Sequence, residues 1–225
     1  MRYEIVKAGE SRSFPTSHPF LDQAAPHGEG LFYLGMDAGR AIDKGEGHES
    51  RTFVAIELGT ECLGSHTGEH RGEEGSNVVG FARFRLGDAD PSPLVELVRQ
   101  PGTHPAAIEA AKAVFQAAGL VVAVCNDFPG RIVDRLIRPY FNAALRRLDE
   151  KLASADDLDK TLCLGLGYPE GPISLLERTG LAHHFRVTQA LHEALGQEPY
   201  APARRARVAA DREERVERGL PCANR

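Results

Sequence analysis

Glu96 is the first residue whose surroundings indicate a chemical role. It lies inside the apolar run "LVELV", and because an unpaired buried carboxylate is costly, an acid there needs a basic partner. The apolar run before it, "NVVGFARF", alternates as a strand does, with Ala82 and Phe84 on one face and Arg83 on the other. The favoured interpretation is that this carboxylate pairs with a nearby arginine or faces water, and the alternative is that it has a catalytic role.

A second group of candidate residues lies in and before the stretch "SHTGEH". It contains residue types that ligate metal ions, namely Glu61, Cys62, His66, Glu69 and His70. The sequence around them is rich in glycine and polar residues, which predicts a surface loop rather than a helix holding both histidines on one face. We therefore expect no bound metal, and a metal-binding activity at the His66/His70 loop is the weaker alternative.

Composition excludes several classes of protein. The chain has 225 residues and a formal net charge of −5, which argues against a nucleic-acid-binding surface. Its longest apolar run, "AAGLVVAVC", is too short to span a bilayer. The four cysteines form no Cys-x-x-Cys pair, as in reduced cytosolic proteins, and the N-terminal sequence resembles no signal peptide. We expect a cytoplasmic protein without a membrane or nucleic-acid partner.

The elements that must position these residues fall into two halves. Residues 1–126 contain six candidate strands bounded by turn-forming residues, "YEIV", "LFYLGM", "TFVAIEL", "NVVGFARF", "LVELV" and "LVVAVC". Between the last two, "THPAAIEAAKAVFQAAG" carries an apolar stripe at helical spacing. A strand, a helix and a strand in succession form a βαβ unit, so we predict an α/β domain with a mostly parallel sheet.

Residues 127–225 are expected to form an all-α domain. A long apolar stripe from Ile132 to Leu148 predicts an extended helix that is buried along one face. Ser154 and Asp157 have the spacing of a capping box, and "GPISLLERTG" and "LAHHFRVTQALHEALG" predict two helices that each end at a glycine. Asp134, in the first turn of the long helix, is expected to be stabilised by the helix dipole and by Arg131 or Arg135.

Three segments resemble the 3-hydroxyacyl-CoA dehydrogenase family. "NDFPGRIVDRLIRPYFNAAL" resembles its Asp-x-Pro-Gly-Phe-x-x-Asn-Arg helix start, and "DLDKTLCLGLGYPEGPISLLERTGL" is similar to its Gly-Tyr-Pro-x-Gly-Pro signature. Residues 78–124 resemble the end of its nucleotide-binding domain. The resemblance implies a Rossmann-like α/β domain followed by a helical domain, an acyl-CoA ligand, NAD as cofactor, and a homodimer formed through the helical domain.

The resemblance also implies a site, which this chain alters. Glu96 matches the family acid that orients the catalytic histidine, whereas the histidine position falls on Ala82, and alanine cannot accept a proton. Asp134 falls where the family has an asparagine that polarises the substrate carbonyl, and Glu61 falls near a family serine. A carboxylate at position 134 would repel a developing oxyanion.

The cofactor end departs from the family as well. The first strand runs into "KAGESRSF", which has one glycine and no helix-opening pattern, in place of Gly-x-Gly-x-x-Gly. About sixty residues precede the "GTECL" turn, roughly half of what two βαβ units require. We therefore predict an abbreviated Rossmann-like domain at residues 1–126 that binds NAD weakly or not at all.

These observations together favour a catalytically degenerate, 3-hydroxyacyl-CoA dehydrogenase-like protein of acyl-CoA metabolism that acts in acyl-CoA binding or subunit pairing. The alternative is an active NAD-dependent 3-hydroxyacyl-CoA dehydrogenase with a rebuilt site.

Overall fold

The structure is a computed structural model that describes residues 1–69 and 76–219. The chain divides into two compact units, which are considered separately. Unit 1 consists of Met1–Arg85 and Pro91–Val133, and unit 2 consists of Leu86–Asp90 and Asp134–Arg225. Among the described residues, no helix is both long enough and apolar enough to cross a membrane.

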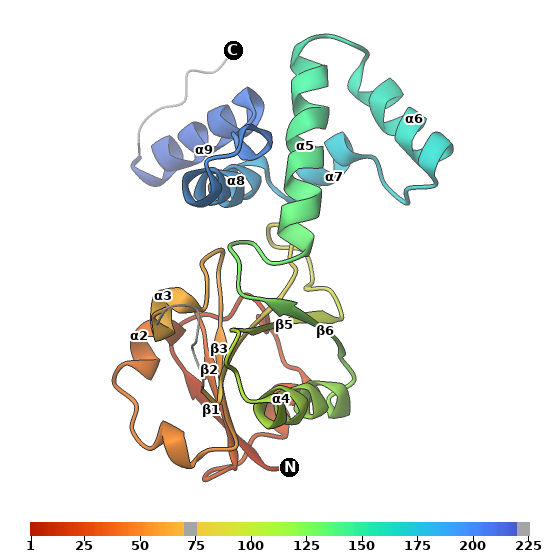
Figure 1. Ribbon diagram of the computed structural model, residues 1–225. Coiled ribbons are helices and arrows are strands. Elements are labelled where there is room, and N and C mark those ends of the chain that lie inside the picture. Colours follow the sequence, from red (N-terminus) through yellow and green to blue (C-terminus); the bar gives the residue numbers. More distant parts are fainter. Residues whose placement is uncertain (70–75, 220–225) are drawn as a thin grey trace. The chain divides into compact units, whose positions relative to one another are not determined.

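Unit 1 is built on a six-stranded sheet (Figure 1). The strands lie side by side in the order of the sequence: β1 (Tyr3–Lys7), β2 (Gly30–Leu34), β3 (Phe53–Glu57), β4 (Val78–Arg83), β5 (Leu94–Arg99) and β6 (Val121–Asn126). Strands β4 and β5 pair antiparallel, and the other neighbours pair parallel. The six predicted strands and the mostly parallel sheet are therefore confirmed.

Apolar side chains cover both faces of this sheet. One face packs against α1 (Pro19–Asp22) and α4 (Pro105–Ala117) through a cluster of aromatic rings that includes Phe20, Phe32 and Phe115. The other face packs against α2 (Ala38–Ile42) and the start of α3 (Gly64–Thr67). Burying each such aromatic side chain contributes roughly 1.5–3 kcal/mol, and this core fixes the strands that carry the candidate site.

Two helical features of unit 1 bear on the predictions. The helix expected between the last two strands is present as α4, with a proline in its first turn, and the chain leaves it at Gly119, whose φ is 84°. The surface loop predicted around His66 is wrong for residues 64–67, which form α3. Leu63 is fully buried in the core at the start of this helix, and burial of that side chain holds the short helix against the sheet.

Unit 2 is helical, as predicted. Its helices are α5 (Val133–Asp149), which begins at the last residue of unit 1, α6 (Ala155–Leu166), α7 (Pro172–Thr179), α8 (Leu181–Leu195) and α9 (Arg204–Glu217). A short 3-10 helix, η2 (Glu198–Tyr200), joins the last two, and another, η1 (His48–Ser50), lies in unit 1. The predicted capping of α6 is confirmed, because the Ser154 hydroxyl accepts the Asp157 backbone N–H at 3.1 Å.

Candidate active site

Ala82 and Glu96 are direct neighbours across the antiparallel pair of strands. The register of β4 and β5 places Ala82 opposite Glu96, and both residues are buried. Cβ atoms that face each other in such a pair lie roughly 4.5–5.5 Å apart. The structure therefore brings together the two positions that the sequence analysis matches to the family's base and acid.

Glu96 is held by the segment that enters helix α5. One carboxylate oxygen, Oε1, accepts the backbone N–H groups of Ile132 and Val133, each at 2.8 Å. The other oxygen, Oε2, lies 3.5 Å from Nε of Arg131, and the two side chains are 3% and 5% exposed. Arg131 thus supplies the cation that a buried carboxylate needs, in agreement with the interpretation that Glu96 pairs with an arginine.

Arg131 is placed by an unusual backbone conformation. Its φ is +52°, a left-handed value that is uncommon for a residue other than glycine, and it follows Gly130, whose φ is +73°. The guanidinium Nη2 donates to the carbonyl oxygen of Gly59 at 2.5 Å, whereas Nη1 and Nε are buried without a hydrogen-bond partner, so the contact of Nε with Glu96 is an ion pair only. The turn therefore directs a fixed positive charge into the interior of unit 1, next to the candidate site.

Asp134 belongs to a buried polar network of unit 2. Its Oδ1 accepts from Nε of Arg138 at 2.7 Å, so its ion pair is with the arginine one turn further along α5. Nη1 of Arg138 lies 3.2 Å from Nδ1 of His184, and Nε2 of His184 lies 3.0 Å from Oδ1 of Asn142. Because a guanidinium only donates, Nδ1 of His184 accepts and Nε2 carries the proton. Burial, followed by the charge of Arg138, lowers the pKa of His184 to about 3.

Glu61 lies in the turn after β3 and has different partners. Its carboxylate accepts the backbone N–H of Gly59 at 2.9 Å and lies 3.4 Å from Nε2 of His66. The ring of His66 covers Gly39, where an added Cβ would come within 2.2 Å of it. Within residues 1–69 and 76–219, no group of three His, Cys, Asp or Glu side chains could hold a metal ion. His70 lies outside the described residues.

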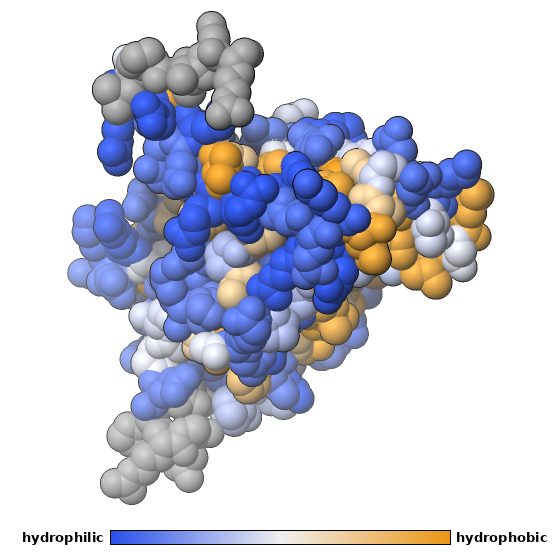
Figure 2. Space-filling view, turned by 90° about the horizontal axis from the view of Figure 1, so that it is seen from above, coloured by the Kyte–Doolittle hydropathy of each residue, from blue (hydrophilic) through white to orange (hydrophobic). Residues whose placement is uncertain are grey.

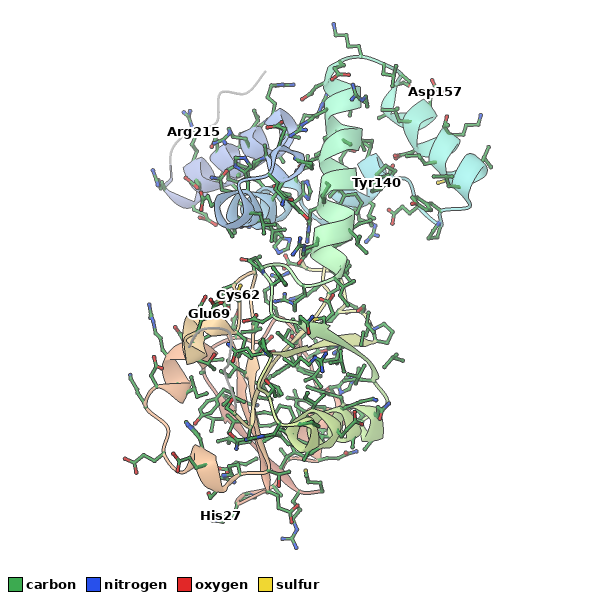
Figure 3. All side chains as sticks on the ribbon, in the orientation of Figure 1. His27, Cys62, Glu69, Tyr140, Asp157 and Arg215 are labelled. Atoms are coloured by element: carbon green, nitrogen blue, oxygen red, sulfur yellow. The ribbon has the colours of Figure 1, made fainter. Side chains whose placement is uncertain are left out.

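Two thiols of unit 1 lie beside acidic side chains. Burial, followed by the charge of Asp127, raises the pKa of Cys62 to about 11. Figure 3 labels Cys62 and Glu69, another acid that raises this pKa, in the region of α3. Burial, followed by the charge of Glu96, raises the pKa of Cys125 to about 11. Since the thiolate is the reactive form of cysteine, neither thiol is prepared for nucleophilic chemistry at neutral pH.

The sequence analysis missed Glu57, the last residue of β3. This carboxylate is 7% exposed and accepts the backbone N–H groups of Ser13 and Gly35, each at 2.7 Å. The signal was present in the sequence, because an acid inside the apolar run "TFVAIEL" raises the same question as Glu96 does. Arg138 and His184 were missed because each looks like an ordinary polar residue of an amphipathic helix.

Comparisons with known proteins agree with this architecture. Residues 130–218 match the family model of the 3-hydroxyacyl-CoA dehydrogenase C-terminal domain. A 3-hydroxybutyryl-CoA dehydrogenase of Bradyrhizobium diazoefficiens is 38% identical over 109 residues, which are 48% of this chain and 37% of that protein. The human mitochondrial hydroxyacyl-coenzyme A dehydrogenase is 36% identical over 106 residues, which are 47% of this chain and 34% of that protein. The match thus spans less than half the length of either relative.

A solved structure extends the likeness of the fold beyond these matches. The crystal structure of (S)-3-hydroxybutyryl-CoA dehydrogenase PaaH1 from Ralstonia eutropha aligns with a TM-score of 0.67 and 22% identity. The alignment covers 91% of this chain and 69% of that one. The fold is therefore a Rossmann-like α/β part followed by a helical part, as in that structure. The sequence matches support the assignment to the 3-hydroxyacyl-CoA dehydrogenase family, and residues 130–218 carry the match to its C-terminal domain.

Proposed function

We propose that this chain is a 3-hydroxyacyl-CoA dehydrogenase-like protein of acyl-CoA metabolism that has lost the dehydrogenase reaction and serves in acyl-CoA binding or subunit pairing. The observation that carries the proposal is the pairing of Ala82 with Glu96, whose carboxylate is occupied by Arg131 and two backbone N–H groups. The acid is retained, but the position opposite it offers no atom that can take a proton.

The chemistry of the reaction explains why this loss is decisive. Oxidation of a 3-hydroxyacyl group requires a base for the hydroxyl proton while hydride leaves for the cofactor, and such a base needs a pKa near the working pH. The guanidinium of Arg131 offers only N–H donors and cannot act as that base. A general base contributes a factor of about 10²–10⁴ to the rate, so its loss alone lowers turnover by that factor.

The residue at the oxyanion position gives further support. In the proposal, Asp134 replaces a neutral amide donor by a carboxylate, which forms an ion pair with Arg138. Losing a single oxyanion donor costs about 10²–10³ in rate. The two losses need not multiply, because groups that act as a unit are not additive.

NAD, the cofactor that the family implies, fits this chain poorly. The segment after β1 contains Gly9 but opens no helix, and the next helix, α1, has only four residues. Dinucleotide binding in this fold places the pyrophosphate at the N-terminus of a helix that follows the first strand directly. We therefore expect weak NAD binding at most.

Subunit pairing is proposed to use helix α6. Asp159 is its one buried residue, and the side chains of Leu164 and Leu166 are 78% and 64% exposed. Figure 2, seen from above, shows apolar surface on the right-hand side, where α6 lies in Figure 1. Exposed leucines on a helix that buries so little of its own surface indicate a contact with another protein. We propose that a second copy of this chain makes this contact.

One experiment separates binding from catalysis. Purified wild-type protein is titrated with acetoacetyl-CoA and with free coenzyme A by calorimetry, and NADH oxidation with acetoacetyl-CoA is followed at 340 nm. We expect acetoacetyl-CoA to bind more tightly than coenzyme A and turnover to remain at background. Glu96→Gln, assayed at a temperature where circular dichroism shows it folded, should change the rate little.

The outcomes are distinct. Robust turnover that collapses in Glu96→Gln would establish the alternative, an active NAD-dependent 3-hydroxyacyl-CoA dehydrogenase with a rebuilt site. Failure of both acetoacetyl-CoA and coenzyme A to bind would remove the acyl-CoA-binding role. Subunit pairing would then rest on sedimentation of the full chain.

A further inference from the structure

Unit 1 has a cavity of about 430 Å³ at one edge of its sheet. It lies among the segments that follow β1, β2 and β3, and its ionisable lining residues are Arg12, Asp37, Arg40, Glu57, Glu61 and His66. In open α/β sheets, ligands bind outside the carboxyl ends of the strands. By position alone, this cavity is where a nucleotide would be expected.

The carboxylate of Glu57 already accepts hydrogen bonds from two backbone N–H groups at this cavity. Oε1 of Glu57 accepts the N–H of Ser13, and Oε2 accepts the N–H of Gly35, both at 2.7 Å. Ser13 lies in the segment after β1, and Gly35, with a φ of +111°, is the first residue after β2. Backbone N–H groups from such turns are the donors that bind anions in phosphate sites. Here the bound anion is a side chain of the same chain.

The other cations of the cavity have partners within the chain, and Arg12 donates from Nη2 to the carbonyl oxygen of Arg85 at 3.5 Å. Arg40 pairs with Asp37 at 3.4 Å, and His66 lies 3.4 Å from Glu61. The helices that begin at this edge, α2 and α3, have five and four residues, which is too short for a strong dipole at the N-terminus. A pyrophosphate in the cavity would face three carboxylates, one of them buried, against the two arginines Arg12 and Arg40.

We propose that Glu57 is a built-in occupant of the anion position, and that it closes this cavity to dinucleotides and other phosphate-bearing ligands. The acid at the end of β3 then determines specificity, because the cavity rejects an anionic ligand. This inference deepens the proposed loss of dehydrogenase activity, but its test measures anion binding and does not depend on turnover.

The test compares anion binding in the full-length wild type and in variants at position 57. Inorganic pyrophosphate is titrated by calorimetry, and NADH by its fluorescence, into wild type, Glu57→Ala and Glu57→Gln. Glu57→Ala frees both N–H donors and removes the charge, so we expect it to bind pyrophosphate at least about tenfold more tightly than wild type. Glu57→Gln keeps the volume and removes only the charge, so its gain should be smaller.

Glu49→Gln is the matched control. It removes one negative charge from an exposed position in η1, outside the cavity, and should leave pyrophosphate binding as in wild type. Amide resonances identify the site, because pyrophosphate should shift the Gly35 and Ser13 N–H signals in the position-57 variants and not in wild type. If Glu57→Ala does not fold, Glu57→Gln and these resonances decide the question.

Two results would overturn the proposal. The first is a wild-type protein that binds NADH in the low micromolar range with shifts at Gly35 and Ser13, because the cavity would then accept a dinucleotide with Glu57 in place. The second is a folded variant at position 57 that binds pyrophosphate no better than wild type and Glu49→Gln do. In that case, the two N–H donors would not form an anion site even when they are released.

Discussion

Replacing Glu96 by glutamine should cost stability rather than catalysis. Oε1 accepts the N–H groups of both Ile132 and Val133, so the amide oxygen of a glutamine can keep both hydrogen bonds. What the substitution removes is the charge that faces Nε of Arg131, whose side chain is 5% exposed. Leaving a buried cation unpaired typically costs about 3–5 kcal/mol, so we expect Glu96→Gln to lower the free energy of unfolding of unit 1 by that amount.

A double-mutant cycle isolates this ion pair. Arg131→Met removes the cation and keeps much of its volume, so Glu96→Gln/Arg131→Met should recover most of the loss seen in Glu96→Gln. The control is Glu4→Gln, which breaks the ion pair of Glu4 with Arg51. The side chains of Glu4 and Arg51 are 31% and 23% exposed. Pairs that water reaches are worth less than about 1 kcal/mol, so this variant should stay close to wild type.

The assay is urea unfolding followed by hydrogen-exchange mass spectrometry, which resolves peptides of unit 1 from those of unit 2. A loss in Glu96→Gln of less than about 1 kcal/mol, similar to the control, would refute the reasoning. So would a double variant that is no more stable than Glu96→Gln. Either result would mean that the ion pair with Arg131 does not stabilise the fold. A catalytic role for Glu96 would then have to be considered again.

Three further predictions concern the rest of the chain. The pKa of His184 is lowered to about 3 in the folded state, so the unfolded state takes up the proton first, and stability should fall as the pH drops below 6.5. The difference in unfolding free energy between wild type and His184→Gln should change by on the order of 2 kcal/mol between pH 7 and pH 5. His104→Gln, a substitution at an exposed position, is the control and should follow wild type. Parallel pH profiles of His184→Gln and wild type would contradict the prediction. Cys62 and Cys125, with pKa values raised to about 11, should react with iodoacetamide at pH 8 more than about tenfold more slowly than free cysteine, and equal rates measured by peptide mass spectrometry would contradict their burial. Leu164→Asp should shift the full chain from dimer to monomer in sedimentation equilibrium at micromolar concentration, and a wild type that sediments as a monomer would refute pairing through α6.

The sequence alone determined the elements and the kinship of this protein. The six strands and the main helices could be predicted because alternation, apolar stripes and glycine ends are local properties, readable over a few residues. The family could be recognised because its Pro-Gly and Gly-Tyr-Pro turns are local as well. The same matching predicted that Ala82 occupies the position of the family's catalytic base.

Only the tertiary structure decided how the charges are paired. An acid within an apolar run predicts that a partner is present, but the identity of the partner depends on which distant segments come into contact. Glu96 meets Arg131 because the turn at Gly130 carries the chain back over β5, and Asp134 pairs with Arg138 because helical geometry places residues four apart on one face. Glu57 acquires its role because the segments after β1 and β2 both present N–H groups to the end of β3. The sequence of β3 alone does not predict which backbone groups these are.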